Sequence, residues 1–510
     1  MGSKTLNMQS LFEELELGVE NKEEWKITQF SANEEFPQKA RITLENKYWN
    51  ITEITERFNR QSVSFQLSKK DKLHSWLKYK EGFSAELVRI LINEFDIDKG
   101  ATILDPFMGS GTTALVACMN GINSIGYDIL PMSKISINAK SDVNNYNIKE
   151  LLHILNDLTN LEVTKDYSTQ TPTVSITKDG YPIDTAIEIS YINDYIQSSS
   201  YSNNAKNLIK LCMINCLEKV SYSAKDGQYL RWDYRCPKIV KATEDRVRLG
   251  KKPFVVKLDK GKLPTMKEAL IDEFSKIIDD IKEIQRNKNG NIFGANTFIE
   301  GSALYHLPIL EDNMINAVIS SPPYCNRYDY TRTYAMELAF LGVNDDGIRT
   351  LRQELLSCTV ENKTKVERLK DFYESSGFIS RFNSIIEIVQ SNNVLKEIVS
   401  ALNSRNAKGE INNKGVIRMV EGYFTELTFI FAELFRVCKS GAKVAFVNDN
   451  VRYAGEVIPV DYLTTMLAEQ IGFIPLKIYS LKQKKGNSSQ QMKKYGKVSL
   501  RKSITIWEKP

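Results

Sequence analysis

The sequence lacks the features that are typical of a membrane protein, a secreted protein or a metal-binding protein. None of its apolar runs approaches the roughly 18–20 residues that a membrane span needs, and the first twenty residues lack the basic and then apolar pattern of a secretory signal. Its seven cysteines are scattered and odd in number, which is typical of a reducing compartment. Cys212 and Cys216 lie four apart in an expected helix without further ligands nearby, so we expect no metal site. These absences predict a cytoplasmic protein without a membrane anchor.

The sequence also lacks a strong excess of one charge. A net charge of +5 over 510 residues does not by itself indicate a nucleic-acid partner. Hydrophobic residues make up 42% and charged residues 26%, as in a globular protein. A chain of this length is too long for one ordinary core. We therefore expect one catalytic domain with large insertions, or two to three domains.

A strand–turn–helix–strand pattern appears between residues 101 and 127. Ala101–Leu104 and Ser124–Tyr127 are short apolar strands, and a helix covers Ala114–Asn120 between them. Parallel strands joined by a helix indicate an α/β sheet. The pattern is lost from about residue 148 to 296, resumes with a strand at 317–320, and is interrupted again by helical segments from about 348 to 414. In the last part of the chain we expect helices over 425–437 and 461–471 and strands over 443–448, 475–479 and 503–507.

The turn of this pattern, residues 105–113 (DPFMGSGTT), is rich in glycine. Gly109 and Gly111 allow a tight turn and a close approach of the backbone to a ligand, at the sheet edge where open α/β folds bind ligands. The third glycine of a dinucleotide fold and the Gly-Lys-Ser/Thr of a phosphate loop are both missing. Asp105 suits a cation rather than a phosphate, and Asp128 at the end of the next strand can accept both hydroxyls of a ribose. The turn therefore favours S-adenosylmethionine, which carries an ammonium group and a sulfonium.

The tetrapeptide Ser321-Pro322-Pro323-Tyr324 follows the strand at 317–320. An exocyclic amine of a nucleobase is a poor nucleophile because its lone pair is delocalised into the ring. The Ser321 Oγ and the Pro322 carbonyl can accept its two N–H bonds and direct the lone pair at a methyl sulfonium. Tandem prolines make such a loop stiff and rich in acceptors, and Tyr324 offers a face on which a flipped-out base can stack. Positioning the amine against the methyl group would supply most of the rate gain.

Together, the two motifs resemble those of the S-adenosylmethionine-dependent DNA amino-methyltransferases of restriction–modification type. The resemblance covers roughly residues 72–130, 298–342 and 420–510. It implies an α/β fold: a Rossmann-like class I methyltransferase core with a mixed, mostly parallel seven-stranded sheet, plus mostly helical insertions. It implies a cofactor site made by Phe83, Ser84, Asp105, Phe107, Gly109, Gly111, Thr112, Asp128 and Ser302, and a catalytic site made by Ser321, Pro322, Pro323 and Tyr324. Ser302 departs from the family, which usually has an acid at this position.

The first residue of the tetrapeptide bears on the target base. A serine there resembles the cytosine-N4 subgroup, whereas adenine-N6 enzymes more often carry Asp or Asn. Methylation at cytosine C5 needs a cysteine after a proline, and here Cys236 precedes Pro237 instead. Adenine-N6 methylation, amino methylation of RNA or protein, and an inactive DNA-binding subunit stay open as alternatives. The last would be expected if Asp105, Gly109 or the tetrapeptide were degraded, and they are intact.

Two basic segments are candidates for contact with double-stranded DNA. Residues 229–262 hold eleven Lys/Arg against four Asp/Glu, with aromatic residues between them, and residues 482–502 hold eight basic residues and no acid. We expect DNA contacts from Arg231, Trp232, Arg235, Arg248, Lys251 and Lys252, and phosphate contacts from the 484–497 loop. A nuclease motif is missing, so any cognate restriction endonuclease would be a separate chain, in a prokaryote or a phage.

These expectations divide the chain into six parts. They are an N-terminal extension (1–60), a first part of the core with the cofactor half (61–147), an inserted target-recognition region (148–296), a second part of the core with the catalytic loop (297–345), a helical insertion (346–415) and a third part of the core (416–510).

Overall fold

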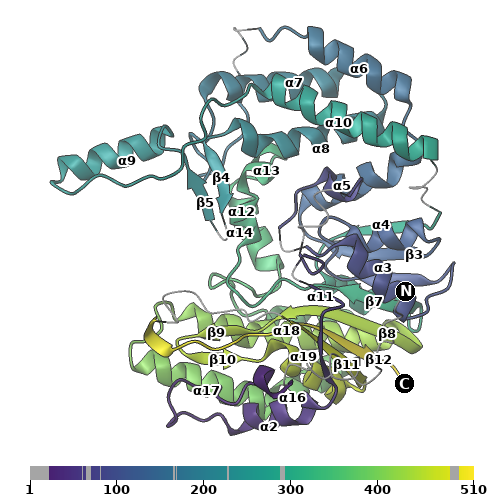
Figure 1. Cartoon of the computed structure of the whole chain (residues 1–510), viewed down its shortest axis with the longest axis vertical. Helices are drawn as coiled ribbons and strands as arrows, with labels where there is room; N and C mark the ends of the chain where they lie inside the picture. The colour runs from purple at the N-terminus through teal and green to yellow at the C-terminus, as the bar shows by residue number, and fades with distance from the viewer. Residues whose placement is uncertain are drawn as a thin grey trace, which may run out of the picture.

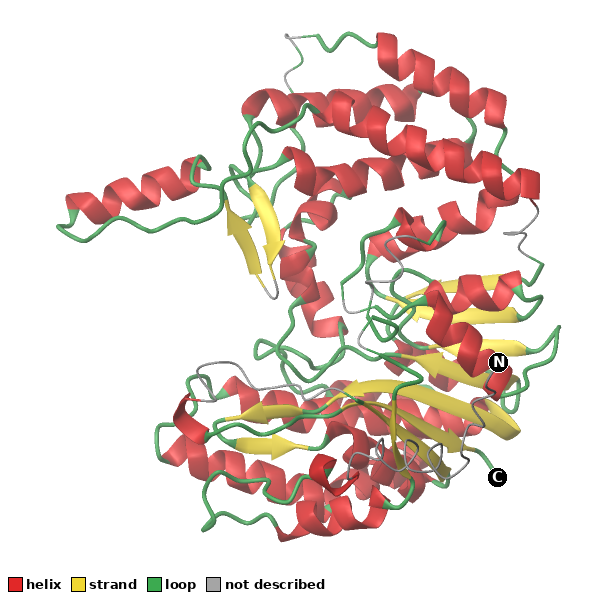
Figure 2. Ribbon diagram, viewed as in Figure 1, coloured by secondary structure: helices red, strands yellow, loops and turns green. Residues whose placement is uncertain are grey.

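Short apolar segments separated by helices build one mixed sheet. The computed structural model describes residues 22–59, 61–64, 71–80, 82–164, 167, 169–226, 229–287, 293–482 and 493–510. Within them the main sheet has eight strands in the order β1-β11-β12-β8-β7-β2-β3-β6 (Figures 1 and 2). They are β1 (Thr52–Thr55), β2 (Thr102–Asp105), β3 (Asn123–Asp128), β6 (Asn296–Glu300), β7 (Ile315–Ser320), β8 (Cys438–Asp449), β11 (Ile474–Leu481) and β12 (Lys502–Glu508).

Strand β12 runs antiparallel to both of its neighbours, and the other pairs are parallel. This confirms a mixed, mostly parallel sheet in a Rossmann-like α/β fold. The expected number of seven strands was one too few. Strands β1 and β6 lie outside the six strands that the sequence located, and β1 pairs with β11 at the edge of the sheet. Its sequence, TEIT, is short and polar, so the N-terminal segment gives no strand pattern.

Alternating residues of the central strands face two different helical layers. In β8, Val444 and Phe446 join one apolar cluster, and Ala445 and Val447 join another on the opposite face. A sheet buried on both faces needs such continuous apolar strands. The first face is covered by α2 (Lys39–Trp49), α16 (Ile379–Ser391), α17 (Asn393–Ala407), α18 (Gly415–Val437) and α19 (Val460–Ile471), and the second by α3 (Ala85–Glu94) and α4 (Thr112–Met119).

A helical lobe stands at the top of Figure 1, beyond the β3–β6 edge of the sheet. It has its own apolar core, to which α6 contributes Leu151, Ile154 and Leu158 at helical spacing. Its helices are α5 (Pro131–Ser141), α6 (Ile148–Asn160), α7 (Ile183–Ser198), α8 (Asn203–Val220) and α10 (Met266–Asn287). The connection back to the core carries α12 (Tyr330–Thr333), α13 (Ala335–Phe340), α14 (Asp345–Glu354) and α15 (Val366–Ser375).

One segment of the 148–296 region leaves the body of the molecule. The hairpin of β4 (Ser223–Asp226) and β5 (Tyr229–Trp232) leads into α9 (Pro237–Arg248), which projects away from every other helix (Figures 1 and 2). The chain then returns along it, and we call residues 237–258 the arm. All twelve residues of α9 are described, and none of them is buried.

The remaining elements are small. They are the hairpin of β9 (Val451–Tyr453) and β10 (Glu456–Ile458), helix α11 (Ala303–His306), and the short 3-10 helices η1 (Lys22–Trp25), η3 (His74–Trp76), η4 (Asp142–Asn144) and η5 (Leu307–Ile309). Across the described ranges, no helix combines the length and apolar character required to cross a membrane.

Candidate active site

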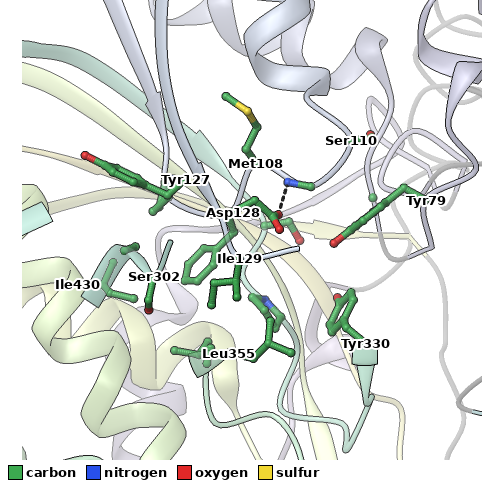
Figure 3. A pocket seen from close by; sticks show the side chains of 18 of the residues that line it. Tyr79, Met108, Ser110, Tyr127, Asp128, Ile129, Ser302, Tyr330, Leu355 and Ile430 are labelled. Carbon is green, nitrogen blue, oxygen red and sulfur yellow. Dashed lines mark hydrogen bonds between the residues drawn. The ribbon is translucent and has the colours of Figure 1, made fainter. Parts of the chain in front are cut away.

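A cavity with about 780 Å³ of space lies at one edge of the sheet. Its wall is made by residues that directly follow β2, β3, β6 and β7. Because these four strands are parallel, their carboxyl ends meet at the same edge, where open α/β folds bind ligands. The glycine-rich turn and the tetrapeptide, about 210 residues apart in the sequence, therefore contribute to one cavity (Figure 3).

The glycine-rich turn has the backbone geometry that its composition predicts. Gly109 and Gly111 have φ angles of +54° and +83°, which L side chains rarely adopt. A Cβ at Gly111 would meet Ile137 Cδ1 at 2.5 Å, and one at Gly109 would meet the ring of Tyr79 at 3.0 Å. Residue 109 must therefore lack a side chain for the backbone to approach both a ligand and Tyr79.

A buried lysine holds this turn from behind. The Nζ of Lys140, on α5, donates to the carbonyl of Ser110 at 2.8 Å. Burial lowers the pKa of Lys140 to about 7. The helical lobe and the turn are thus joined at the wall of the cavity.

Asp128 faces the cavity from the end of β3 (Figure 3). Its Oδ2 accepts the backbone N–H of Gly109 and its Oδ1 that of Leu130, both at 2.8 Å. Burial raises the pKa of Asp128 to about 6, against the opposing effect of these two N–H groups. A carboxylate held by two backbone bonds keeps further lone pairs for the hydroxyls of a ribose.

Asp105 has a different position from the one expected. It is 1% exposed and lies behind the described wall of the cavity. Its Oδ1 accepts the Ser320 hydroxyl at 2.6 Å and the Phe107 N–H at 3.0 Å, while burial raises its pKa to about 6. Asp105 therefore ties the end of β2 to the end of β7 and positions both motifs, without facing a cationic ligand.

The other expected cofactor residues either line the cavity or support it from behind. Ser84 is buried, and its Oγ accepts the Leu87 N–H at 3.3 Å, so it caps α3. Phe83, Phe107, Gly109, Thr112, Asp128 and Ser302 line the cavity, whereas Ser84, Asp105 and Gly111 support it from behind.

The tetrapeptide presents alternate residues to the cavity. Ser321 and Pro323 line it, and Pro322 and Tyr324 lie behind its described wall. The Ser321 hydroxyl donates to the Tyr324 hydroxyl at 3.0 Å, which leaves the lone pairs of the Ser321 Oγ as acceptors. The Tyr324 ring is 3% exposed, with Lys502 Nζ 5.0 Å from its centroid. In this structure the ring therefore does not present a face to the cavity.

Further residues of the wall lie outside the expected cofactor and catalytic sites. The ring of Tyr79 stacks on that of Tyr330, with centroids 6.2 Å apart, and both line the cavity. Aromatic faces attract cations such as a sulfonium or an ammonium group. The remaining wall is mostly apolar and includes Met108, Ile129, Leu304, Leu355, Leu356 and Ile430. Ile129 could have been predicted because it directly follows Asp128. Leu355 and Leu356 come from the 346–415 insertion, where no sequence motif marks them.

The six expected DNA contacts fall into two groups. Nearest the body, Arg231 pairs with Asp226, Arg235 makes two 2.8 Å bonds to Asp233, and the Trp232 ring lies 3.1 Å from Lys238 Nζ. Arg248, Lys251 and Lys252 are exposed at the far end of the arm. The 484–497 loop lies mostly outside the described residues.

Comparison with known proteins places this site in a family. Residues 6–136 match the model of the N6/N4 DNA methylases. The type II methyltransferase M.BsoBI of Geobacillus stearothermophilus is 55% identical over 487 residues, which cover 96% of this chain and 95% of that protein. The chain belongs to the N6/N4 DNA methylase family. The predicted DNA amino-methyltransferase family is confirmed.

Two further relatives of the family differ in how much of the chain they match. The type II methyltransferase M.AvaI of Nostoc sp. is 36% identical over 476 residues, or 92% of each chain. M.MjaII of Methanocaldococcus jannaschii is 42% identical over 106 residues, 20% of this chain and 19% of that protein. The chain is thus a DNA methyltransferase of type II, and its family implies S-adenosylmethionine as the methyl donor.

The chemistry of the cavity fits that donor. An acid, two aromatic rings and an apolar wall match, in chemical type, its sugar, its cationic groups and its purine. Within the described ranges, no group of three or more His, Cys, Asp or Glu side chains is arranged to hold a metal ion. All seven cysteines are free and buried, and burial raises the pKa of the Cys325 thiol well above its ordinary value. A buried neutral thiol is a poor nucleophile.

Proposed function

We propose that the protein is a site-specific DNA methyltransferase that methylates the exocyclic N4 amine of a flipped-out cytosine. The observation that carries the proposal is the position of the Ser321 Oγ. It lines the same cavity as Asp128 and Gly109, and its own proton is donated to Tyr324. Its lone pairs are therefore available to an amine N–H at the end of the cavity where the methyl group must be delivered.

The residues of the chain have separate tasks in this reaction. S-adenosylmethionine, when bound, supplies an electrophilic methyl group. Asp128 binds the ribose, and the aromatic pair of Tyr79 and Tyr330 stabilises positive charge. Ser321 holds one amine N–H bond. The second acceptor is the Pro322 carbonyl, whose peptide bond joins Pro323 in the cavity wall, so that the nitrogen lone pair is directed at the methyl carbon. The Asp105–Ser320 bond keeps the turn and the tetrapeptide in register, which supports the positioning on which most of the rate gain rests.

The choice of cytosine rests on Ser321. Asp or Asn in this position is more usual in the adenine-N6 group, so adenine-N6 methylation is the second candidate. The substrate is double-stranded DNA, because the exposed cations at the end of the arm suit phosphates. A cognate endonuclease would be a separate chain.

Analysis of the methylated nucleoside tests the proposal. The protein is incubated with methyl-labelled S-adenosylmethionine and a duplex library that contains every short sequence. The DNA is then digested and the labelled nucleoside is identified by mass. We expect N4-methylcytosine, and no label with Ser321→Ala at the same protein concentration. N6-methyladenine would replace the first candidate by the second, and absence of label in all DNA would contradict the proposed activity.

A further inference from the structure

A second cavity adjoins the first. The two share Ile129, Gly301 and Ser302 as a common wall. The second cavity is completed by Tyr305, His306, Glu354, Arg368 and Phe372. Glu354 and Arg368 both belong to the 346–415 insertion, which contains neither the glycine-rich turn nor the tetrapeptide.

Glu354 lies at the boundary between the cavities. It is the last residue of α14, and the next two residues, Leu355 and Leu356, line the first cavity. This boundary segment is fixed from behind, because Lys365 Nζ donates to the Leu355 carbonyl at 2.9 Å and to the buried Glu426 at 2.8 Å. Glu354 is therefore held at the rim by a buried network.

An arginine orients the Glu354 carboxylate. Arg368 donates to its Oε1, and the guanidinium lies 4.8 Å from the centre of the Tyr305 ring. The Glu354 side chain is 22% exposed, against 56% for Arg368. This ion pair engages Oε1, and because Glu354 lines the second cavity, its carboxylate keeps lone pairs for a donor there.

The orientation of the cofactor follows from the proposed function. Its methyl end must meet Ser321, and its ribose must meet Asp128. The purine then lies beyond Asp128, on the side of Ile129 and Ser302, where the wall is apolar and suits a flat ring. The second cavity lies beyond this wall, so that the polar edge of the purine faces the charged side chains there.

Ser302 alone does not match that edge. Adenine presents there an amino group, which donates, beside a ring nitrogen, which accepts. A single hydroxyl can serve one of them well, and it carries no charge. We propose that Glu354 is a cofactor-specificity residue: its carboxylate accepts a hydrogen bond from the 6-amino group of the adenine, while Arg368 holds it in place. This inference rests on the proposed function.

Calorimetric binding of two ligands tests it without turnover. One ligand is S-adenosylhomocysteine, and the other is its analogue with hydrogen in place of the 6-amino group. For the wild-type protein we expect the amino ligand to bind about ten- to a hundredfold more tightly, as for a hydrogen bond to a charged group. Glu354→Ala should bring this ratio close to one. Glu354→Gln, which keeps an uncharged acceptor and the size of the side chain, should give an intermediate ratio and carries the test if the alanine variant does not fold.

Two further variants separate recognition from structure. Arg368→Gln removes the ion pair but keeps the carboxylate, so it should preserve most of the ratio. Glu367→Ala removes an exposed acid next to Arg368 on α15, outside both cavity walls, and should leave the ratio unchanged. Equal loss in Glu354→Ala and Arg368→Gln would assign the effect to the pair as a structural element and overturn the inference.

The remaining outcomes distinguish this inference from the function on which it rests. If the wild-type protein binds S-adenosylhomocysteine and Glu354→Ala keeps the full ratio, the inference is wrong and the proposed function stands. If the wild-type protein binds neither ligand, both are wrong.

Discussion

Helices α4 and α9 differ in how far their residues are buried. Seven of the eight residues of α4, Thr112–Cys118, are buried, and its N-terminal turn forms the cavity wall. In α9 none of the twelve described residues is buried, although its apolar and charged residues are arranged on separate faces. The residues for chemistry are thus positioned by neighbours within the chain. The residues that we propose for DNA recognition project from the body, with exposed Val247 and Leu249 beside Arg248, as expected of a surface that meets its partner only in the complex.

A chain of contacts nevertheless joins the two regions. Tyr79, in the cavity wall, stacks on Tyr334 with centroids 5.4 Å apart. Lys225 Nζ, on the hairpin that leads to the arm, lies 4.5 Å from the Tyr334 ring and pairs with Glu337. None of these contacts involves a residue of the arm itself, so we expect changes in the arm to leave the cavity intact, and the reverse.

The largest expected effect is on the chemical step. Ser321→Ala removes one of the two acceptors for the amine, and we expect kcat to fall about a hundred- to a thousandfold, as for loss of one preorganised hydrogen-bonding group. The affinities for S-adenosylhomocysteine and for DNA should stay within about twofold of wild type, because neither binding equilibrium includes the methyl-transfer step. Ser384→Ala, at an exposed position on α16, is the matched control. A comparable loss of cofactor binding would show that Ser321 has a structural role instead.

The next effect is on cofactor binding. Asp128→Asn replaces one acceptor by a donor, and we expect the Kd for S-adenosylhomocysteine to rise about ten- to a hundredfold. Because burial raises the pKa of Asp128 to about 6, the wild-type carboxylate is ionised above this pH and is protonated as the pH falls through it.

Calorimetric titration with S-adenosylhomocysteine at several pH values tests the direction of this pH dependence. Wild-type affinity should fall, by at most about tenfold per pH unit, below about pH 6. A change centred near pH 7 would belong instead to Lys140, whose pKa burial lowers to about 7. The asparagine variant should be flat over the same range, although Asp105 still titrates there. An equally steep decline in the variant would assign the pH dependence to Asp105 or another group.

A smaller effect is expected on the affinity for DNA. Changing Arg248, Lys251 and Lys252 together to Gln should weaken binding about tenfold at moderate salt. It should also reduce the slope of log K against log salt by up to about 3, since each phosphate contact contributes about 0.9. Cofactor binding should not change. The control is a triple Gln variant at exposed lysines elsewhere: Lys149, Lys276 and Lys370. Wild-type binding at every salt concentration would remove the arm from the DNA interface.

The smallest effect is on stability. Val247→Ser, at a position 55% exposed on α9, should change the free energy of unfolding by less than about 0.5 kcal/mol. Urea unfolding of the free protein measures this. A loss above about 1.5 kcal/mol would mean that the chain itself covers this face of the arm, and the contrast with α4 would then be lost.

Local patterns predicted most of the core. The expected strands at 101–104, 124–127 and 317–320 appear as β2, β3 and β7, with ends that differ by at most two residues. They were predictable because apolar alternation, glycines and prolines act over a few residues. Strand β1 was missed, since its four residues become a strand only through pairing with β11, more than 400 residues away.

The sequence by itself determined the chemistry of this protein: the glycines that allow a left-handed turn, the acid after β3, and a stiff loop that begins with a serine. Tertiary structure alone decided which of these residues face the cavity. Asp105 and Tyr324 are in the motifs, yet packing turns them inward, while Leu355 and Glu354 reach the wall from an insertion without a motif. The physical reason is that a motif specifies backbone conformation and functional groups over a few residues. The direction of a side chain depends instead on volume and hydrogen bonds contributed by segments far away in the chain.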